Sequence, residues 1–377
     1  TLRRDELTGW SPKRVPEDAP MCVPALVAAL RTIAILALVL AVGVPGADAA
    51  QHAPAAHPSL DTEIVFLGTA GGPPLRLDRS EPSTLLIVDG HEYLIDCGIG
   101  TMRRMIEAGI KSEQIRTIFL THLHADHDLG LADVMANDFA REDLFGIVGS
   151  FNIYGPPQTR ELVDAAFHFI TVGFRPFEAE TPSAYRIGSG QFMSPFVAHE
   201  FNRDGLIFRD DKISVTAAEN SHYALMPIQQ RKELKSYSYR IETPHGVIVF
   251  TGDTGPSDAV ARLAKGADVL VAEASSRDAE DRDRFINSMA ARNHWPPKRV
   301  QAFRAHFTSE HLDTNSIGAL ATKAQVKAVM LYHYDPLDKA DQAAYASGVK
   351  RDFAGAVFAP DDLDRYCMVT GTIGPCR

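Results

Sequence analysis

The stretch Thr121-His-Leu-His-Ala-Asp-His127 decides the fold, because it places three imidazoles and one carboxylate within six consecutive positions. Such a density of metal-ligating side chains suits a site that holds two metal ions. Residues 116–121 are mainly apolar and predict a short buried strand, whereas the pattern over 129–139 predicts a helix. The metal-ligating residues therefore lie on a strand-loop-helix corner.

The four ligand-type side chains of this corner divide into two pairs. His122 and His124 are two positions apart, so in extended backbone they face the same side and could share one ion. Asp126 and His127 follow the turn and can reach a second ion. A polar loop without a metal is the alternative, but so many ligand types directly after an apolar strand argue against it.

Three further candidate ligands lie downstream, and each follows a strand pattern. They are His222, Asp253 and His333. Taken singly, each could equally be a polar turn residue. Their recurrence at the C-terminal ends of predicted strands makes coincidence a poor explanation.

The motif His-x-His-x-Asp-His resembles the signature of the metallo-β-lactamase superfamily. The resemblance implies an α/β fold, a four-layer αββα sandwich with a dinuclear metal site at the shared edge of its two sheets. It also implies two Zn²⁺ ions and a metal-bridging hydroxide as nucleophile, since two cations lower the pKa of a shared water from about 15.7 towards 7. A nitrogen and oxygen ligand set without cysteine suits zinc and leaves Mn²⁺ or Fe open. The implied ligands are His122, His124 and His222 for one ion, Asp126, His127 and His333 for the other, and Asp253 as the bridge.

The interleaving of strand and helix patterns agrees with this sandwich. Strands are expected at 63–67, 83–88, 92–95, 151–154, 213–218, 236–242, 246–250, 268–272 and 326–332. Helices are expected near 100–109, 159–170, 257–265, 279–292, 315–324 and 340–351. Asp89-Gly90 predicts a hairpin turn between the second and third strands.

Several segments over residues 63–335 resemble the ribonuclease Z branch of the superfamily. Residues 64–72 resemble its opening strand and glycine loop, residues 268–274 its His-Glu-Ala-Thr segment, and His311 stands where the branch carries a His-x-Thr motif. Beside Asp126, the candidate catalytic residues are His311, as proton donor to the leaving group, and Glu273, which would orient it. Structural roles remain open for both residues. His311 could be a polar residue before the N-cap of the following helix, and Glu273 could simply end a strand.

Other features depart from that branch. Only 31 positions separate His222 from Asp253, which leaves no room for a tRNA-clamping arm, and Ala272 replaces the histidine of His-Glu-Ala-Thr. The formal net charge of the chain is −10, which repels a polyanion unless a local basic patch exists. The sequence therefore argues against tRNA and favours a small-molecule substrate.

The N-terminal region has the pattern of an export signal. An uncharged apolar run over 32–44 precedes small residues up to Ala49, so residues 21–49 are expected to be a cleaved signal peptide and 50–377 a single hydrolase domain, periplasmic or secreted. Residues 1–20, which precede Met21, are expected to be non-structural or a mis-annotated start. A run of about thirteen residues is too short to cross a ~30 Å hydrocarbon layer, so no stable membrane insertion is expected after cleavage.

Cysteine and aromatic residues add two structural expectations. In an oxidising compartment Cys367 and Cys376 could close a small C-terminal disulfide loop, while Cys97 is expected to be buried. The eight phenylalanines and one tyrosine of 167–208 could form a lid over the metals, or instead fill the core beneath a long loop. The charged, helical region 275–311 could form the opposite wall.

We therefore expect a metal-dependent hydrolase that cleaves an ester-type bond in a small substrate, with a phosphodiester preferred. A carboxylic ester or lactone, an aryl sulfate or a β-lactam are the alternatives within the enzyme class. A zinc-holding protein that binds a ligand without turnover is the non-enzyme alternative. The oligomeric state is left open.

Overall fold

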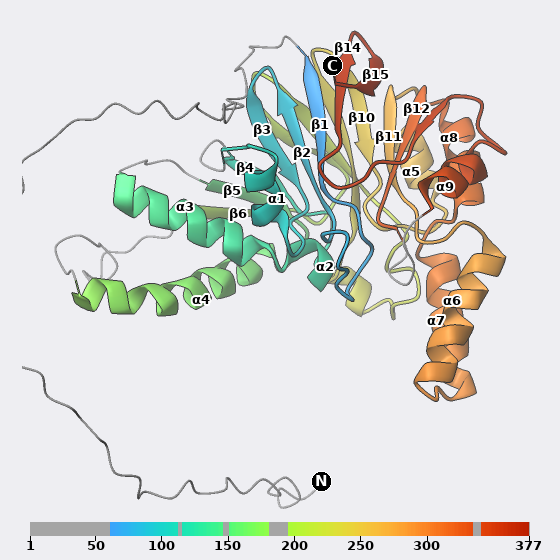
Figure 1. Cartoon of the computed structure of the whole chain (residues 1–377), viewed down its shortest axis with the longest axis horizontal. Helices are drawn as coiled ribbons and strands as arrows, with labels where there is room; N and C mark the ends of the chain where they lie inside the picture. Colours follow the sequence, from blue (N-terminus) through green and yellow to red (C-terminus); the bar gives the residue numbers. More distant parts are fainter. Residues whose placement is uncertain (1–60, 112–114, 146–150, 181–194, 335–340, 377) are drawn as a thin grey trace, which may run out of the picture. The chain divides into compact units, whose positions relative to one another are not determined.

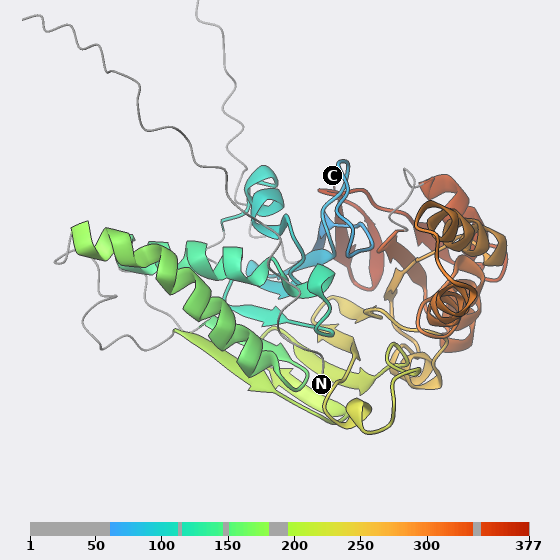
Figure 2. The ribbon, with the colours of Figure 1, turned by 90° about the horizontal axis from the view of Figure 1, so that it is seen from below.

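Two β-sheets face each other, and helices cover the outer face of each (Figures 1 and 2). The computed structural model describes residues 61–111, 115–145, 151–180, 195–334 and 341–376. The described residues belong to one compact unit, whereas the expected signal peptide at 21–49 lies outside them. In the described part of the chain, no helix has the length and apolar content that a membrane crossing needs.

The first sheet is built mainly from the N-terminal half of the described chain. Its strands are β1 (Thr62–Gly68), β2 (Ser83–Val88), β3 (His91–Ile95), β4 (Thr117–Phe119), β5 (Phe151–Gly155), β6 (Phe196–Glu200), β14 (Arg365–Val369) and β15 (Thr372–Pro375). They lie in the order β15-β14-β1-β2-β3-β4-β5-β6. The expected hairpin turn joins β2 to β3, where Asp89 and Gly90 both have positive φ, as a type I′ turn requires.

The second sheet comes from the C-terminal half. Its strands are β7 (Gly205–Arg209), β8 (Ser214–Glu219), β9 (Tyr237–Thr243), β10 (Gly246–Phe250), β11 (Val269–Glu273), β12 (Ala328–Tyr332) and β13 (Ala356–Phe358). They lie in the order β13-β12-β11-β10-β9-β8-β7, and β10 to β13 run parallel. Such buried parallel strands read as continuous apolar runs, as Val-Leu-Val-Ala over 269–272 does.

Three hydrophobic clusters hold the layers together. The first lies between the sheets, where Phe66 and Phe119 from one sheet pack in the same cluster as Tyr239 and Phe250 from the other. The second joins the outer face of the second sheet to its helices, α5 (Asp258–Leu263), α8 (Thr314–Ala324) and α9 (Gln342–Val349). The third joins the first sheet to α1 (Thr101–Glu107), α3 (Leu131–Phe145) and α4 (Thr159–Glu180). These four layers confirm the predicted αββα sandwich.

The remaining helices lie near the sheet edge that carries the ligand candidates. The short α2 (Ala125–Asp128) contains part of the histidine motif. Two longer helices, α6 (Ala279–Arg292) and α7 (Pro297–Ser309), pack on each other and project from the second half (Figure 1). Pro297 occupies the first turn of α7, a position where the missing proline N–H has no intrahelical partner to lose.

The structure adds elements that the apolar patterns did not predict. Strands β6, β7, β13, β14 and β15 are all short, and several alternate only partly, so their pairing partners decide their conformation rather than their own sequence. The residues between Cys367 and Cys376 form the β14–β15 hairpin, closed by the expected disulfide, which is therefore confirmed. Cys97 is a buried free thiol, as expected.

Candidate metal centre

The ligand candidates stand where strands end at one edge of the sandwich. His122 lies three residues beyond the end of β4, and His124 occupies the N-cap position of α2. His222 and Asp253 each lie three residues beyond the ends of β8 and β10, and His333 directly follows β12. Strand ends are rigid supports, so four separate segments of the chain, residues 122–127 and the three later strand ends, place these side chains with little freedom.

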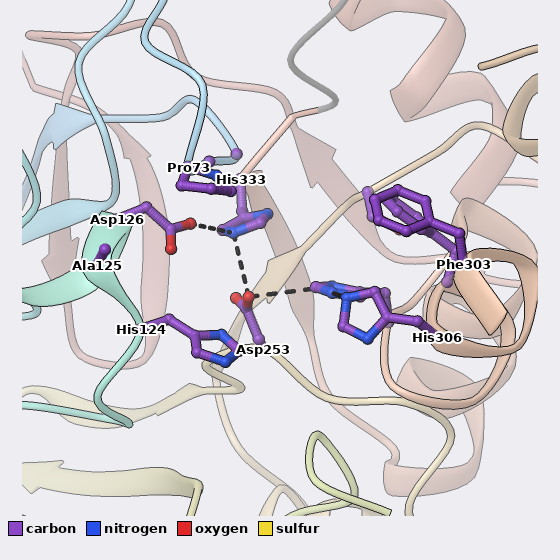
Figure 3. Close-up of a pocket in the computed structure, with 13 residues that line it drawn as sticks. Pro73, His124, Ala125, Asp126, Asp253, Phe303, His306 and His333 are labelled. Atoms are coloured by element: carbon purple, nitrogen blue, oxygen red, sulfur yellow. Dashed lines mark hydrogen bonds and ion pairs between the residues drawn. The ribbon is translucent and has the colours of Figure 1, made fainter. Parts of the chain in front are cut away.

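The seven predicted ligands come together in two groups that share one carboxylate. The first group contains His122, His124, His222 and Asp253, and the second contains Asp126, His127, Asp253 and His333. Within each group, the potential ligand atoms all lie within 4.8 Å of one another. The arrangement matches the predicted division, with Asp253 common to the two groups. Figure 3 shows Asp253 with His124, Asp126 and His333 around it.

Short distances around Asp253 place it at the centre. Its Oδ1 is 3.3 Å from Nε2 of His127, and its Oδ2 is 3.2 Å from Nε2 of His333. The Nε2 atoms of His122 and His222 both lie 3.9 Å from Oδ2. One carboxylate therefore faces imidazoles of both groups.

The donor atoms in this cluster fit a pair of divalent cations. Nε2 of His122, His127 and His333, together with Oδ1 of Asp253, are buried and have no hydrogen-bond partner. Buried polar atoms are nearly always satisfied, and a cation at the centre of each group would satisfy these. His124 is partly exposed, whereas the other six side chains are buried.

The Nδ1 atoms of three imidazoles, those facing away from the centre of the cluster, lie within hydrogen-bond distance of neighbouring protein groups. Nδ1 of His127 lies 2.9 Å from Oδ2 of Asp96, and Nδ1 of His222 lies 2.9 Å from the carbonyl of Glu310. Nδ1 of His122 lies 3.0 Å from the hydroxyl of Thr121. When Nδ1–H donates to the Asp96 carboxylate or the Glu310 carbonyl, Nε2 carries the lone pair that a metal requires.

The carboxylates of the cluster favour positive charge on two of its histidines. Burial opposes protonation of His333, but Asp253 and Asp126 outweigh it and raise its pKa to about 10. The pKa of His127 is raised well above its usual range by Asp253 and Asp96 in the same way, against the effect of burial. Groups that attract protons this strongly in a buried site attract divalent cations for the same reason, and the two compete.

A histidine and a glutamate form a hydrogen-bonded pair beside the ligands. Nδ1 of His311 is 2.8 Å from Oε2 of Glu273, and Oε1 of Glu273 accepts hydrogen bonds from the backbone N–H groups of Thr254 and Leu312. Asp313 caps the following helix by accepting a hydrogen bond from the N–H of Ser316. The helix therefore has its own cap, and the role proposed for His311 as partner of Glu273 fits the geometry.

The protonation of this pair follows from its burial. Burial lowers the pKa of His311 to about 3, and burial with the charge of Asp253 raises the pKa of Glu273 well above its usual range. Both shifts favour a neutral pair, in which Glu273 donates to Nδ1 and His311 keeps its proton on Nε2. That nitrogen lies 3.1 Å from Nε2 of His306, whose Nδ1 is 2.7 Å from Oε2 of Glu310.

His306 is a site residue that sequence reasoning did not single out. It lines the cavity with the ligand candidates, and its carboxylate partner Glu310 stands four positions later, at the C-cap of the same helix. The spacing His306-x-x-x-Glu310 was a usable signal, because residues four apart on a helix are neighbours.

The cavity over the metal ligands has a volume of about 420 Å³. Its lining residues are Gly71, Gly72, Pro73, His124, Ala125, Asp126, Asp253, Ser275, Phe303, His306, Phe307, His311 and His333. Among the residues that the structure describes, none from 167–208 is in this lining, whereas helix α7 supplies one wall, as the prediction for 275–311 allowed. Phe167 and Phe174 pack in the hydrophobic cluster under the first sheet, which favours the core interpretation of that aromatic region.

Two glycines of the loop after β1 close the other side of the cavity. A Cβ atom on Gly72 would lie 2.2 Å from Cβ of Asp126, and one on Gly71 would lie 2.8 Å from Nδ1 of His333. The backbone of the glycine loop therefore lies so close to Asp126 and His333 that a side chain at Gly71 or Gly72 would not fit.

This geometry agrees with comparisons to known proteins. The sequence model of the Beta-lactamase superfamily domain matches residues 91–334, which is more than half of the chain. The chain belongs to the beta-lactamase superfamily. Ribonuclease Z from Mycobacterium bovis is 27% identical to this superfamily member over 309 residues, which cover 80% of this chain and 97% of the relative.

Two solved structures share the fold. The metallo-beta-lactamase fold protein YhfI from Bacillus subtilis has a TM-score of 0.58 at 16% identity, covering 81% of this chain and 99% of its own. The short form of human tRNase Z has a TM-score of 0.52 at 20% identity, covering 80% and 98%. This superfamily member resembles ribonuclease Z and is a metal-dependent hydrolase, and the family implies a divalent metal at the ligand cluster.

Proposed function

We propose that this chain is an exported di-zinc phosphodiesterase that hydrolyses a small substrate. The observation that carries the proposal is the pair of buried ligand groups that share Asp253, with the His311–Glu273 pair beside them. The relatives named ribonuclease Z cleave phosphodiester bonds, which supports this bond type over the alternatives.

Zinc suits the donor set. His122, His124 and His222 would hold one ion, Asp126, His127 and His333 the other, and Asp253 would contact both. Imidazole and carboxylate donors without thiolate are typical of zinc sites and also accept Mn²⁺ or Fe. When bound, the metal pair supplies a nucleophile at neutral pH by lowering the pKa of water, and it neutralises charge that develops on the substrate.

The side chains beyond the ligands supply the proton for the leaving group. His311 lines the cavity, and Glu273 fixes the orientation of its ring through Nδ1. The remaining nitrogen, Nε2, lies 3.1 Å from Nε2 of His306, another residue of the cavity wall. His311 can therefore pass a proton to a leaving oxygen while Glu273 returns one to Nδ1.

Several features support a small substrate over tRNA. Of the described residues that line the cavity, none is lysine or arginine, so the protein offers a phosphate chain no counter-charge beside the metal ligands. The segment between His222 and Asp253 consists of a short 3₁₀ turn at Gln230–Lys232 and the strands β9 and β10, which leaves no inserted arm. The formal charge of −10 supports the same proposal.

Export is part of the proposal and has separate support. Residues 21–49 carry the signal-peptide pattern, and the Cys367–Cys376 disulfide suits an oxidising compartment such as the periplasm or the exterior.

A hydrolase panel tests the proposed reaction. Zinc-reconstituted protein covering residues 50–377 is assayed with bis-p-nitrophenyl phosphate, p-nitrophenyl acetate, p-nitrophenyl sulfate, a lactone and a β-lactam, with His124→Ala as the blank. We expect turnover of the phosphodiester and little of the others. The reverse pattern would replace the phosphodiesterase by one of the other hydrolases, and a zinc-loaded but inert protein would favour a ligand-binding role.

A further inference from the structure

One face of helix α7 forms the cavity wall opposite the metal ligands. Phe303, His306 and Phe307 are spaced i, i+3 and i+4, so they project from the same side of the helix. Figure 3 shows Phe303 and His306 on one side of Asp253, with Asp126 and His124 on the other. A ligand held at the metal ligands would therefore extend towards this face, which we call the α7 wall.

The phenyl rings of the α7 wall are held from behind by other aromatic groups. The ring of Phe303 is 4.8 Å from that of Trp295, and the guanidinium of Arg299 lies over Trp295 at 4.6 Å. The ring of Phe307 packs at 5.3 Å against Phe285. Rings fixed in this way lose little conformational entropy when a ligand binds, so less of the favourable ring–ligand contact energy is offset.

The contact between Phe307 and His311 ties the wall to the proposed proton donor. Their ring centroids are 5.3 Å apart at an interplanar angle of 28°, so the two rings are stacked. The remaining lining residues are small, namely Gly71, Gly72, Pro73, Ala125 and Ser275.

The polarity and size of the cavity narrow the ligand further. Positive charge would be confined to the metal ligand cluster, because the described lining contains no lysine or arginine. A volume of about 420 Å³ is at the small end of the range for small-molecule sites. The cavity therefore combines one anion-binding end with one aromatic wall.

We propose that this site takes esters of planar aromatic groups, with the aromatic ring against Phe303 and Phe307 and the ester at the metal ligands. The inference rests on the proposed function, because it requires the ester group to bind at the metal centre. A simple aryl group and a nucleobase both offer the planar ring, and the experiment separates these two sources.

The test measures affinity without turnover. Binding of methylphosphonate, phenylphosphonate and adenosine 5′-monophosphate to zinc-reconstituted protein is measured by titration calorimetry. We expect phenylphosphonate to bind at least about tenfold more tightly than methylphosphonate, since the phenyl ring adds apolar burial and ring contacts. Stronger binding of adenosine monophosphate than of phenylphosphonate would assign the ring to a nucleobase, and the opposite order to a simple aryl group.

Variants locate the source of any preference. Phe303→Ala and Phe307→Ala should each reduce the preference for phenyl over methyl, taken as the ratio of the two affinities, by about three- to tenfold. Phe169→Ala is the matched control, because Phe169 is a 73% exposed phenylalanine on α4 and lies outside the cavity. If an alanine variant fails to fold, the corresponding leucine variant, which keeps the apolar volume, should still lower the preference by at least about twofold.

Equal affinity of the wild-type protein for methylphosphonate and phenylphosphonate would overturn the inference. A preference that survives both Phe303→Ala and Phe307→Ala would also overturn it. Failure of the proposed function is distinguishable, because it would appear as absent phosphodiester turnover in the hydrolase panel while the phosphonate affinities remain measurable.

Discussion

Asp253 is the residue on which both proposed metal positions depend. Each histidine belongs to one ligand group, whereas the Asp253 carboxylate belongs to both. We therefore expect reconstituted wild-type protein to hold about two metal ions per chain, His124→Ala about one, and Asp253→Ala fewer than one. Elemental analysis after gel filtration measures this, with Asp211→Ala as a control, since the Asp211 side chain is 77% exposed. Wild-type protein without stoichiometric metal would contradict the assignment.

In the proposed mechanism Glu273 acts through His311, so its removal should affect the chemical step more than binding. In the neutral pair Glu273 donates to Nδ1 of His311, so Glu273→Gln can still donate there through its amide and can accept from Thr254 and Leu312. We expect kcat to fall about tenfold in Glu273→Gln and about 10²–10³-fold in Glu273→Ala, with KM and metal content little changed.

Steady-state kinetics across pH measures the Glu273 effect. A positioning role predicts that the limb of the pH profile assigned to the proton donor shifts in Glu273→Gln and is lost in Glu273→Ala. A parallel loss of metal or of the cooperative thermal transition would instead identify Glu273 as a purely structural residue.

The ligand residues were predictable from sequence because each follows an apolar strand by a few positions. His122, His222 and His333 need only the rule that strand ends meet at one edge, together with the resemblance that ordered them. His306 was not predicted, because its role depends on how the α6–α7 hairpin packs, and the pattern along one helix does not specify which neighbour its face meets.

At the scale of elements, the glycine loop after β1 sets the shape of the second ligand group. A Cβ on Gly72 would lie 2.2 Å from Cβ of Asp126. Because this distance is a clash, either the loop backbone or Asp126 would have to shift. We expect Gly72→Ala to displace Asp126 and to lower the metal content by about one ion per chain. Metal analysis and circular dichroism measure the effect.

Gly173→Ala is the matched control for this substitution. Gly173 lies inside α4, and nothing lies within 4 Å of an added Cβ. Alanine there should raise the free energy of unfolding by up to about 1 kcal/mol and leave the metal content unchanged. Full metal content in Gly72→Ala would show that the loop moves without disturbing Asp126.

A carboxylate from the C-terminal segment holds the same loop in place. Asp362 accepts hydrogen bonds from the backbone N–H and hydroxyl of Thr69 and from the backbone N–H of Ser80, and it pairs with Arg104. Asp362→Ala leaves buried donors unpaired, so we expect the free energy of unfolding to fall by about 2–3 kcal/mol and KM to rise. Urea denaturation and kinetics measure both, with exposed Asp352→Ala as control. Unchanged stability and KM would show that Asp362 does not support the loop.

Sequence patterns predict strands best where the strand is well buried, as in β10 and β12. Residues 246–250 and 326–332 were assigned to strands because continuous apolar runs mark parallel strands buried on both faces. Strand β7 was not predicted, because it is partly exposed and its extended conformation depends on pairing with β8. Strand β15 was not predicted, because it ends in Gly374 and Pro375 and these residue types are rare in strands. Here pairing with β14 determines their conformation.

At the scale of the whole molecule, the disulfide at the C-terminal edge of the sandwich bears on the proposed export, because disulfides persist in oxidising compartments. Cys367 and Cys376 join β14 to the end of β15 across a sequence separation of nine, and β14 pairs with β1 at the edge of the first sheet. Closing a loop of this length restricts the unfolded chain. We expect the Cys367→Ser, Cys376→Ser double variant to lose about 2–3 kcal/mol of unfolding free energy.

Thiol titration of protein isolated from its native compartment tests export and disulfide together. Residues 50–377 contain Cys97, Cys367 and Cys376, so denatured, unreduced protein should show a single thiol, and reduced protein should show three. The folded protein should show none, because burial raises the pKa of Cys97 and shields it from reagent. An intact N-terminal segment, which adds Cys22, and four thiols without reduction would place the protein in a reducing compartment. Export would then be wrong, while the metal centre, which contains no cysteine, would remain available for hydrolysis.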